Sequence, residues 1–355
     1  MSRPLESHIF SNCVKYERLS PLIAHAFKGS TDTYLDIYID MNSAIKALYG
    51  DKNYSPIISS YKSMTSCILN MCGHYKYYFK KYLGVDTSIY MVMGNNCSDI
   101  SNKFVAEYNS SFKYKMESNK IANSIIKDNM ELLNKMVPYL SNIYLIESQF
   151  ETAGVIAALI EKRIQEGNSN PNLIISRDIL NMQLISLYPK TAMVRPTKYN
   201  NEDRSYIIGP LNSMPIEEYW KIFNSFISKS NKVMKNIHPI NTALLMAMTG
   251  YNKTNLTKII DIIKAKEYIY NCVGDNPIKC SVKTLYEMNP ELNDIVSWTV
   301  IESRFKVYDI EFHKAIFQNS IEYKLLHFVD LYDPNVIRRI NDKVFYNNPI
   351  DIEKL

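Results

Sequence analysis

Residues 35–43 read Leu-Asp-Ile-Tyr-Ile-Asp-Met-Asn-Ser, and they hold the pattern that decides the fold. The apolar run over residues 34–40 ends at Asp40, and residues 41–49 then change to helical spacing that stops at Gly50. This change predicts a short buried strand that leads directly into a helix. Asp40 therefore stands at the junction between a strand and a helix.

The same change from strand to helix recurs along the first part of the chain. We expect further strands at residues 88–93, 142–146, 172–176 and 191–195. We expect helices at residues 56–83, 99–137, 151–166 and 179–187. Strands that alternate with helices indicate an α/β fold with a mostly parallel sheet flanked by helices.

The strand signals fade from about residue 214, and the rest of the chain has helical patterns. We expect helices at residues 215–236, 240–249, 255–271 and 281–345. A length of 355 residues suits two domains or one domain with a large extension. The first would be an α/β domain at residues 1–212, with a helical insertion at about 99–137. The second would be a helical domain at residues 213–355, with a helix–turn–helix-like segment at about 240–271.

The composition is that of a globular protein. Hydrophobic residues make up 46 % of the chain, and the formal charge of +5 permits a polyanionic partner without requiring one. We expect no membrane span, because no apolar run reaches about 18 residues. The N-terminus lacks the features of a signal peptide, so we expect an intracellular protein. Abundant Tyr and scarce Gly, with many Asn, Lys and Ile, indicate an AT-rich genome, such as that of a virus, a phage or an AT-rich microbe.

The six cysteines lie at irregular spacings, which argues against a disulfide framework. Cys67, Cys72 and His74 could be read as half of a zinc site. No matching second pair follows them in the sequence, so a zinc site is not our expectation.

Three acidic residues lie where a parallel sheet would gather them. Asp40 ends the first strand, Asp178 follows the strand at 172–176, and Glu151 opens the helix at 151–166. Ligands of such sheets bind outside the carboxyl ends of the strands, and clustered carboxylates suit Mg²⁺ or Mn²⁺. The alternative interpretation is that Asp40 and Asp178 cap helices, since Asp is a favoured N-cap residue.

The contexts of these acids resemble the flap endonuclease and 5′–3′ exonuclease group of PIN-like nucleases. Asp40 with Met-Asn-Ser looks like that group's opening Asp motif, residues 143–159 look like its Glu-bearing helix, and residues 173–178 look like its Ser-x-Asp strand end. The resemblance covers roughly residues 34–260. It implies a PIN-like fold, with Asp40, Glu151 and Asp178 as candidate catalytic and metal-binding residues. It also implies DNA as a partner.

The chain departs from this group at several places where the resemblance implies further acids. Those positions hold Met93-Gly94-Asn95, Ala153, Gly154, Leu180, Tyr251 and Thr254. We therefore expect a nucleic-acid-binding protein with a degraded metal site, a non-catalytic or weakly active subunit of a viral or phage replication, transcription or virion assembly. Two alternatives stay open. One is an active Mg²⁺- or Mn²⁺-dependent 5′ nuclease with a reduced one-metal site, and the other is a purely structural protein-interaction subunit.

Basic residues near aromatic residues are candidates for contacts to nucleic acid, because Lys neutralises phosphate and aromatic rings stack on unpaired bases. The candidates are Lys76, Lys80 and Lys81, then Lys113 and Lys115 in the arch-like insertion, and Lys253 and Lys258 at the helix–turn–helix-like turn. The partner would be branched or single-stranded DNA, with RNA as a second candidate. Each stretch could instead be the solvated face of a helix. The aromatic stripes after residue 281 indicate core packing or an interface for a protein partner.

Overall fold

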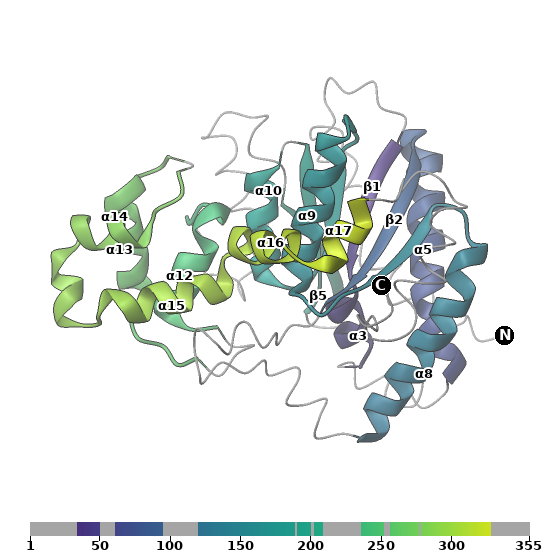
Figure 1. Ribbon diagram of the computed structural model, residues 1–355, viewed down its shortest axis with the longest axis horizontal. Helices are drawn as coiled ribbons and strands as arrows, with labels where there is room; N and C mark the ends of the chain where they lie inside the picture. The colour runs from purple at the N-terminus through teal and green to yellow at the C-terminus, as the bar shows by residue number, and fades with distance from the viewer. Residues whose placement is uncertain are drawn as a thin grey trace.

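A six-stranded sheet lies at the centre of the computed structural model (Figure 1). The structure describes residues 34–49, 61–94, 120–188, 190–199, 202–208, 236–251, 256–276 and 278–327. The strands are β1 (Tyr34–Asp40), β2 (Asp86–Met93), β3 (Ile143–Glu147), β4 (Asn172–Ile175), β5 (Thr191–Tyr199) and β6 (Glu202–Ile208). Their order across the sheet is β3-β2-β1-β4-β5-β6. The first five strands are parallel, and β6 runs antiparallel to β5 at one edge.

Helices cover both faces of the sheet, because residues that alternate along each strand point to opposite sides. On β1, Ile37 and Ile39 belong to one buried cluster and Tyr38 belongs to the other. The first cluster packs against α3 (Met41–Tyr49), α5 (Tyr61–Leu83) and α8 (Lys120–Met136). The second packs against α9 (Thr152–Gln165) and α10 (Leu184–Leu187). The predicted α/β class with a mostly parallel sheet flanked by helices is therefore confirmed.

The second part of the chain is helical. Its helices are α12 (Thr242–Thr249), α13 (Ile262–Val273), α14 (Val282–Met288), α15 (Trp298–Tyr308), α16 (Ile310–Gln318) and α17 (Ile321–His327). Short 3-10 helices are η1 (Val137–Tyr139), η2 (Ile179–Gln183), η5 (Pro239–Asn241) and η6 (Pro290–Asp294). In Figure 1, α13 and α14 lie at the end of the long axis opposite to α5 and α8, and α16 and α17 return across α9.

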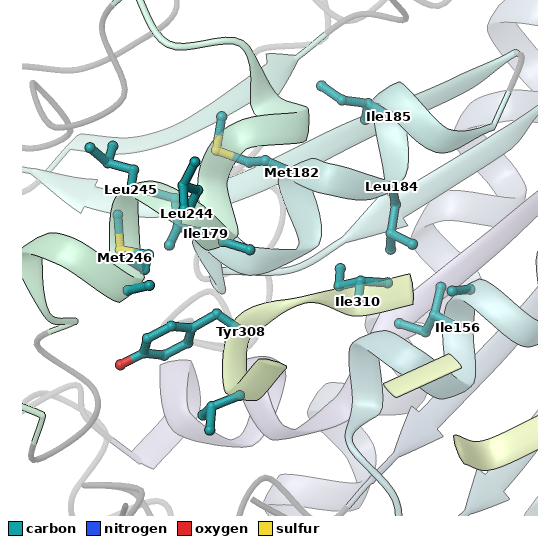
Figure 2. Close-up of a cluster of buried hydrophobic side chains, with 14 of the residues drawn as sticks. Ile156, Ile179, Met182, Leu184, Ile185, Leu244, Leu245, Met246, Tyr308 and Ile310 are labelled. Carbon is teal, nitrogen blue, oxygen red and sulfur yellow. The ribbon is translucent and has the colours of Figure 1, made fainter. Parts of the chain in front are cut away.

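One continuous apolar cluster joins the sheet to the C-terminal helices. Figure 2 shows side chains of α9, η2, α10, α12, α15 and α16 gathered in it, including Ile156, Met182, Leu245 and Tyr308. All four side chains are at most 2 % exposed. The C-terminal helices therefore share a core with the helical layer of the sheet. The division into domains at residues 212 and 213 stays a prediction.

The structure contains one strand that we did not expect, and one expected helix begins later than predicted. We did not expect β6, whose seven residues Glu202–Ile208 pair with β5 as an antiparallel edge. Residues 256–261 are not helical, and α13 begins only at Ile262, because the side chain of Asp261 accepts a hydrogen bond from the backbone of Ile263 and caps the helix. The predicted segments at 56–60, 99–119, 215–235 and 328–345 lie outside the described residues.

Among the helices of the described ranges, none has both the length and the apolar character that crossing a bilayer requires.

Candidate functional site

Asp40 lies at the carboxyl end of β1, where its side chain is 3 % exposed. Its Oδ1 accepts a hydrogen bond of 3.0 Å from the backbone N–H of Ser43, which caps the start of α3. Its Oδ2 accepts hydrogen bonds of 2.6 Å from the hydroxyls of both Ser43 and Ser176. The side-chain amide of Asn181 also points to Oδ2, at 3.5 Å. Both carboxylate oxygens of Asp40 are therefore engaged within the protein.

Asp178 lies just beyond the end of β4 and caps η2. Its Oδ1 accepts a hydrogen bond of 3.0 Å from the backbone N–H of Leu180 and another of 3.0 Å from the hydroxyl of Tyr251. The backbone N–H of Asp178 donates to the hydroxyl of Ser176. The N-cap interpretation of Asp40 and Asp178 is thus confirmed, and Tyr251 ties the site to the end of α12.

Glu151 is the third predicted acid, and it is the N-cap residue of α9. Its side chain makes no capping hydrogen bond, unlike those of the other two acids. Its Oε1 is buried and has no hydrogen-bond partner among the described residues. Burial makes a carboxylate costly to ionise where no hydrogen bond compensates its charge.

The electrostatics of the three acids are coupled. Burial raises the pKa of Glu151 well above its ordinary value, and the charges of Asp178 and Asp40 raise it further. Burial also raises the pKa of Asp40, against the opposing effect of the hydrogen bonds from Ser176 and Ser43. The sheet therefore does bring the predicted acids into electrostatic reach of one another.

A divalent metal needs carboxylate oxygens that converge on one point. Within the described ranges, no group of three or more His, Cys, Asp or Glu side chains is arranged to hold a metal ion. The oxygens of Asp40 already accept three short hydrogen bonds, and Oδ1 of Asp178 accepts two. The buried Oε1 of Glu151 would suit a cation, but the carboxylates as arranged do not form a metal site.

Gly94 follows β2 at a position where the resemblance implied an acid, and neighbouring backbone surrounds it closely. A Cβ atom placed on Gly94 would lie 2.5 Å from the backbone nitrogen of Thr152, and it would also meet the carbonyl oxygen of Phe150. The carbonyl of Gly94 accepts a 2.7 Å hydrogen bond from the side-chain amide of Asn42, which also donates to the Thr152 hydroxyl at 2.8 Å. This position has no room for a side chain.

Packing also fills other positions where the resemblance implied an acid. A Cβ on Gly154 would lie 2.7 Å from the Cβ of His313, because α9 and α16 approach closely there. Leu180 packs against the apolar cluster, and the ring of Tyr251 meets that of Tyr308 edge to face at 6.3 Å. Leu180 and Tyr251 therefore make contacts that an acidic side chain would lose, and Gly154 has no room for such a side chain. Thr254 lies outside the described residues.

Our prediction of site residues missed the polar partners of Asp40. Ser43, Ser176 and Asn181 are each at most 7 % exposed, and together they surround one carboxylate. The spacing Asp-x-x-Ser at a helix start was a visible signal for Ser43, because that spacing favours capping. No local signal pointed from Asp40 to Ser176, which is 136 positions away.

Two neighbouring acids have separate roles. Asp36 is fully buried on β1 and forms an ion pair of 2.8 Å with Arg163 near the end of α9. It also accepts hydrogen bonds from the side chains of Asn168 and Asn170. Burial raises the pKa of Glu147, at the end of β3, while a hydrogen bond from Asn134 lowers it. Asp36 thus fastens α9 to the sheet rather than facing the strand ends.

The predicted lysines of α5 lie on its outer side, whereas most of the neighbouring aromatics are core. Tyr75, Tyr78 and Phe79 are at most 3 % exposed. Lys76 donates to the carbonyl of Ser141, Lys80 pairs with Asp86, and Lys81 lies over the ring of Tyr77, with its Nζ 5.4 Å from the ring centre. Tyr77 is 60 % exposed, so solvent reaches its ring.

The other predicted lysines are more scattered. Lys258 pairs with Asp261 at 3.2 Å before the start of α13, with both side chains exposed. Lys258 lies beside Gly250 at the end of α12, whereas Lys76, Lys80 and Lys81 belong to α5. In Figure 1, α5 and α12 are separated by the sheet and its helices. Lys113, Lys115 and Lys253 lie outside the described residues.

The other sequence patterns have structural roles. Cys72 lies in the core beside Met91, with 3.8 Å between the two sulfur atoms, and Cys67 is also buried. Of the C-terminal aromatic residues, Tyr308 and Phe317 are core, while Trp298 is 36 % exposed.

No protein-family model and no curated protein sequence matches the chain. Among solved structures, it is similar to the flap endonuclease of bacteriophage T5 in a pseudo-enzyme–product complex with DNA and metal ions. That pair is 14 % identical, with a TM-score of 0.47, over 87 % of this chain and 99 % of the other. The zinc-bound 5′-exonuclease of T5 is also 14 % identical, with a TM-score of 0.44, over 80 % of this chain and 98 % of the other.

Proposed function

We propose that the protein binds nucleic acid without cleaving it, as a subunit of a viral or phage replication, transcription or virion assembly. The observation that carries this proposal is the engagement of Asp40. Its carboxylate accepts a backbone hydrogen bond and two hydroxyl hydrogen bonds from Ser43 and Ser176. These bonds tie the ends of β1 and β4 to the start of α3, so the acid has a structural task.

A metal ion at this edge would compete with those bonds. Hydrogen bonds to a charged group contribute about 1.5–3 kcal/mol each, so stripping Asp40 of its donors would be costly. The packing at Gly94 and Gly154 further favours a scaffold function, because neither position can accept a larger side chain without a shift of neighbouring atoms. These contacts support a PIN-like scaffold that keeps its shape and has lost part of its metal chemistry.

Exposed lysines supply the proposed nucleic-acid contacts. Lys80 and Lys258 form exposed ion pairs, which contribute only about 0–1 kcal/mol and can exchange their carboxylate partner for a phosphate. Tyr77 beside Lys81 offers an exposed ring on which an unpaired base could stack. The proposed ligand is branched or single-stranded DNA, with RNA as the competing polyanion. Lys113, Lys115 and Lys253 complete the proposed set from its sequence context.

Binding can be measured by fluorescence anisotropy with labelled 5′-flap DNA, single-stranded DNA and single-stranded RNA over a series of salt concentrations. We expect affinity to fall as salt rises, because phosphate contacts release counterions. The variants Lys80→Ala with Lys81→Ala, and Lys258→Ala, should weaken binding and flatten the salt dependence. Lys283→Ala is the matched control, since Lys283 is also an exposed, ion-paired lysine of a helix. If all four lysines behave alike, these positions do not form the interface.

A reduced one-metal nuclease is the second candidate, and Glu151 is the observation in its favour. Its buried Oε1 has no hydrogen-bond partner in the described ranges, and it lies within electrostatic reach of Asp40 and Asp178. These three residues would hold Mg²⁺ or Mn²⁺ after a local rearrangement. A rise in melting temperature with Mn²⁺ that Glu151→Gln abolishes would support this candidate. A melting temperature that Mn²⁺ leaves unchanged would rule out this candidate.

We also propose that a protein partner contacts the C-terminal helices. Ile295, Trp298 and Val300 are between 36 % and 52 % exposed and lie close together in sequence at the start of α15. Where exposed apolar side chains form one contiguous patch, they favour an interface over a solvated surface. Chemical cross-linking of the full chain in extracts of infected or producing cells, compared with Trp298→Lys, tests this proposal.

A further inference from the structure

The sheet has a second end, opposite to the strand ends that carry Asp40 and Asp178. We call it the amino edge, and it is formed by the first residues of β1, β2 and β3. β1 has seven residues from Tyr34 to Asp40, so its two ends lie about 20 Å apart. In Figure 1, α3 lies at the lower end of the sheet, where β1 ends, so the amino edge is at the upper end. Tyr34 is 45 % exposed there.

Two contacts place the last turns of α5 at the amino edge. Lys80 forms an ion pair of 2.8 Å with Asp86, the first residue of β2, and Asp86 pairs in register with Tyr34 of β1. Lys76 donates a hydrogen bond of 2.6 Å to the carbonyl of Ser141, two residues before β3. Both contacts join α5 to the start of a strand.

Two further exposed tyrosines belong to this edge. Tyr77 follows Lys76 on α5 and is 60 % exposed. Tyr139 ends η1, two residues before Ser141, and is 85 % exposed. The rings of Tyr34, Tyr77 and Tyr139 therefore come from three separate segments of the chain and reach solvent at the same end of the sheet.

Lysines accompany these rings. The Nζ of Lys81 lies 5.4 Å from the centre of the Tyr77 ring. Lys80 is ion-paired with Asp86, and Lys135, in the last turn of α8 before η1, is ion-paired with Glu131 at 2.7 Å. All four of these ion-paired side chains are exposed. Such pairs contribute little to stability, so a phosphate can replace the carboxylate as the partner of each lysine.

Exposed rings beside lysines are what single-stranded nucleic acid requires, because unpaired bases stack on aromatic rings and cations neutralise phosphates. We propose that the amino edge binds single-stranded nucleic acid, with bases stacked on Tyr77 and Tyr139 and phosphates beside Lys80 and Lys81. This inference rests on the proposed binding function and gives it a place and a ligand class. A duplex is a poorer ligand for these rings, because its bases already stack on one another. A strand bound here lies at the other end of β1 from Asp40.

Fluorescence anisotropy of the full chain tests this inference with three labelled probes: a single strand of DNA, the RNA of the same sequence, and the blunt DNA duplex. In Tyr77→Leu with Tyr139→Leu, we expect affinity for the single strands to fall about fivefold or more, since stacking on two rings is lost. Affinity for the duplex should stay unchanged. Tyr77→Phe with Tyr139→Phe should keep the affinity, because both rings remain. Tyr270→Leu is the matched control, since Tyr270 is a 54 % exposed tyrosine of α13.

Photo-cross-linking of the unmodified chain to a single strand that contains bromodeoxyuridine locates the contact without any substitution. Trypsin cleaves after Lys76, Lys80, Lys135 and Lys162, so Tyr77 falls in peptide 77–80 and Tyr139 in peptide 136–162. We expect mass spectrometry to find the nucleotide on both peptides. Cross-links confined to other peptides would overturn the inference, even if the leucine variants failed to fold.

The outcomes separate this inference from the wider proposal. If the unmodified protein binds single strands and the leucine variants bind them equally well, the amino edge is not the site, whereas the binding function stands. The same holds if the leucine variants lose affinity for the duplex as much as for the single strands. If the unmodified protein binds none of the three probes, both proposals are overturned.

Discussion

The hydroxyl of Ser176 donates a 2.6 Å hydrogen bond to the carboxylate of Asp40 and so joins the ends of β4 and β1. Removal of this donor in Ser176→Ala leaves a buried carboxylate with one bond fewer. We expect a loss of about 1.5–3 kcal/mol in the free energy of unfolding, since the acceptor is charged. Urea denaturation measures it. Ser303→Ala is the control, because the exposed Ser303 hydroxyl bonds only its own helix and should change stability by less than about 0.5 kcal/mol.

Gly94 and Gly73 provide a matched pair of glycine substitutions. Gly94→Ala would drive a Cβ against the backbone of Phe150 and Thr152, whereas a Cβ on Gly73 in α5 meets no atom within 4 Å. We expect Gly94→Ala to destabilise the protein by about 1–3 kcal/mol through overpacking. Gly73→Ala should stabilise it by about 0.5–1 kcal/mol, because Ala is the better helix former. Equal effects of the two substitutions on the denaturation midpoint would contradict the described packing at the end of β2.

Glu151 should give the protein a particular dependence on pH. Burial, Asp178 and Asp40 raise the pKa of Glu151 in the folded state, so the folded protein keeps a proton that the unfolded chain has already lost. The free energy of unfolding should therefore fall as pH rises from the ordinary pKa of Glu through the raised pKa of the folded state. In Glu151→Gln this decline should be smaller. Part of it should remain, because the pKa of Asp40 is raised as well.

Denaturation at a series of pH values between about 4 and 8 measures this slope. Glu131→Gln is the control, since Lys135 lowers the pKa of the exposed Glu131 by a hydrogen bond and its charge. The interaction of Glu131 with Lys135 has the opposite pH dependence, because its contribution to the free energy of unfolding is lost as pH falls. A Glu151→Gln variant with the same pH dependence as the unmodified protein would show that Glu151 is solvated rather than buried.

Gly154 lets α16 approach α9, and a Cβ there would lie 2.7 Å from the Cβ of His313. We expect Gly154→Ala to destabilise the protein by about 1–3 kcal/mol and to speed hydrogen exchange in α16. The ion pair of Lys314 with Glu161, at 2.6 Å, joins the same two helices, so the same substitution should weaken it. Unchanged exchange in α16, measured by mass spectrometry, would mean that the two helices do not touch at this glycine.

The sequence predicted much of the sheet, because its strands are apolar runs bounded by clear turns or helix starts. β1 has the predicted bounds of residues 34–40, and the expected strands near β2, β3 and β4 differ from the structure by at most two residues at either end. β6 escaped prediction because Glu202, Asp203 and Arg204 give it a polar sequence, and it pairs only with β5 at the edge. Its stability comes from the neighbouring strand rather than from its own pattern.

The site was predictable only in part. The rule that functional residues follow strand ends pointed to Asp40 and Asp178, and the sheet does place both at the same edge. The partners that engage Asp40 depend on tertiary contacts between residues far apart in sequence, as the contact with Ser176 illustrates. The packing that surrounds Gly94 likewise depends on the loop before α9. Local sequence contains neither kind of information.

We propose that this fold binds nucleic acid and that its acids serve the structure instead of cleavage. The most direct test incubates the purified protein with end-labelled 5′-flap DNA and Mn²⁺, beside Asp178→Asn, and follows binding and product formation in the same samples. We expect salt-sensitive binding, with the DNA intact in both samples. Cleavage by the unmodified protein that Asp178→Asn abolishes would contradict it.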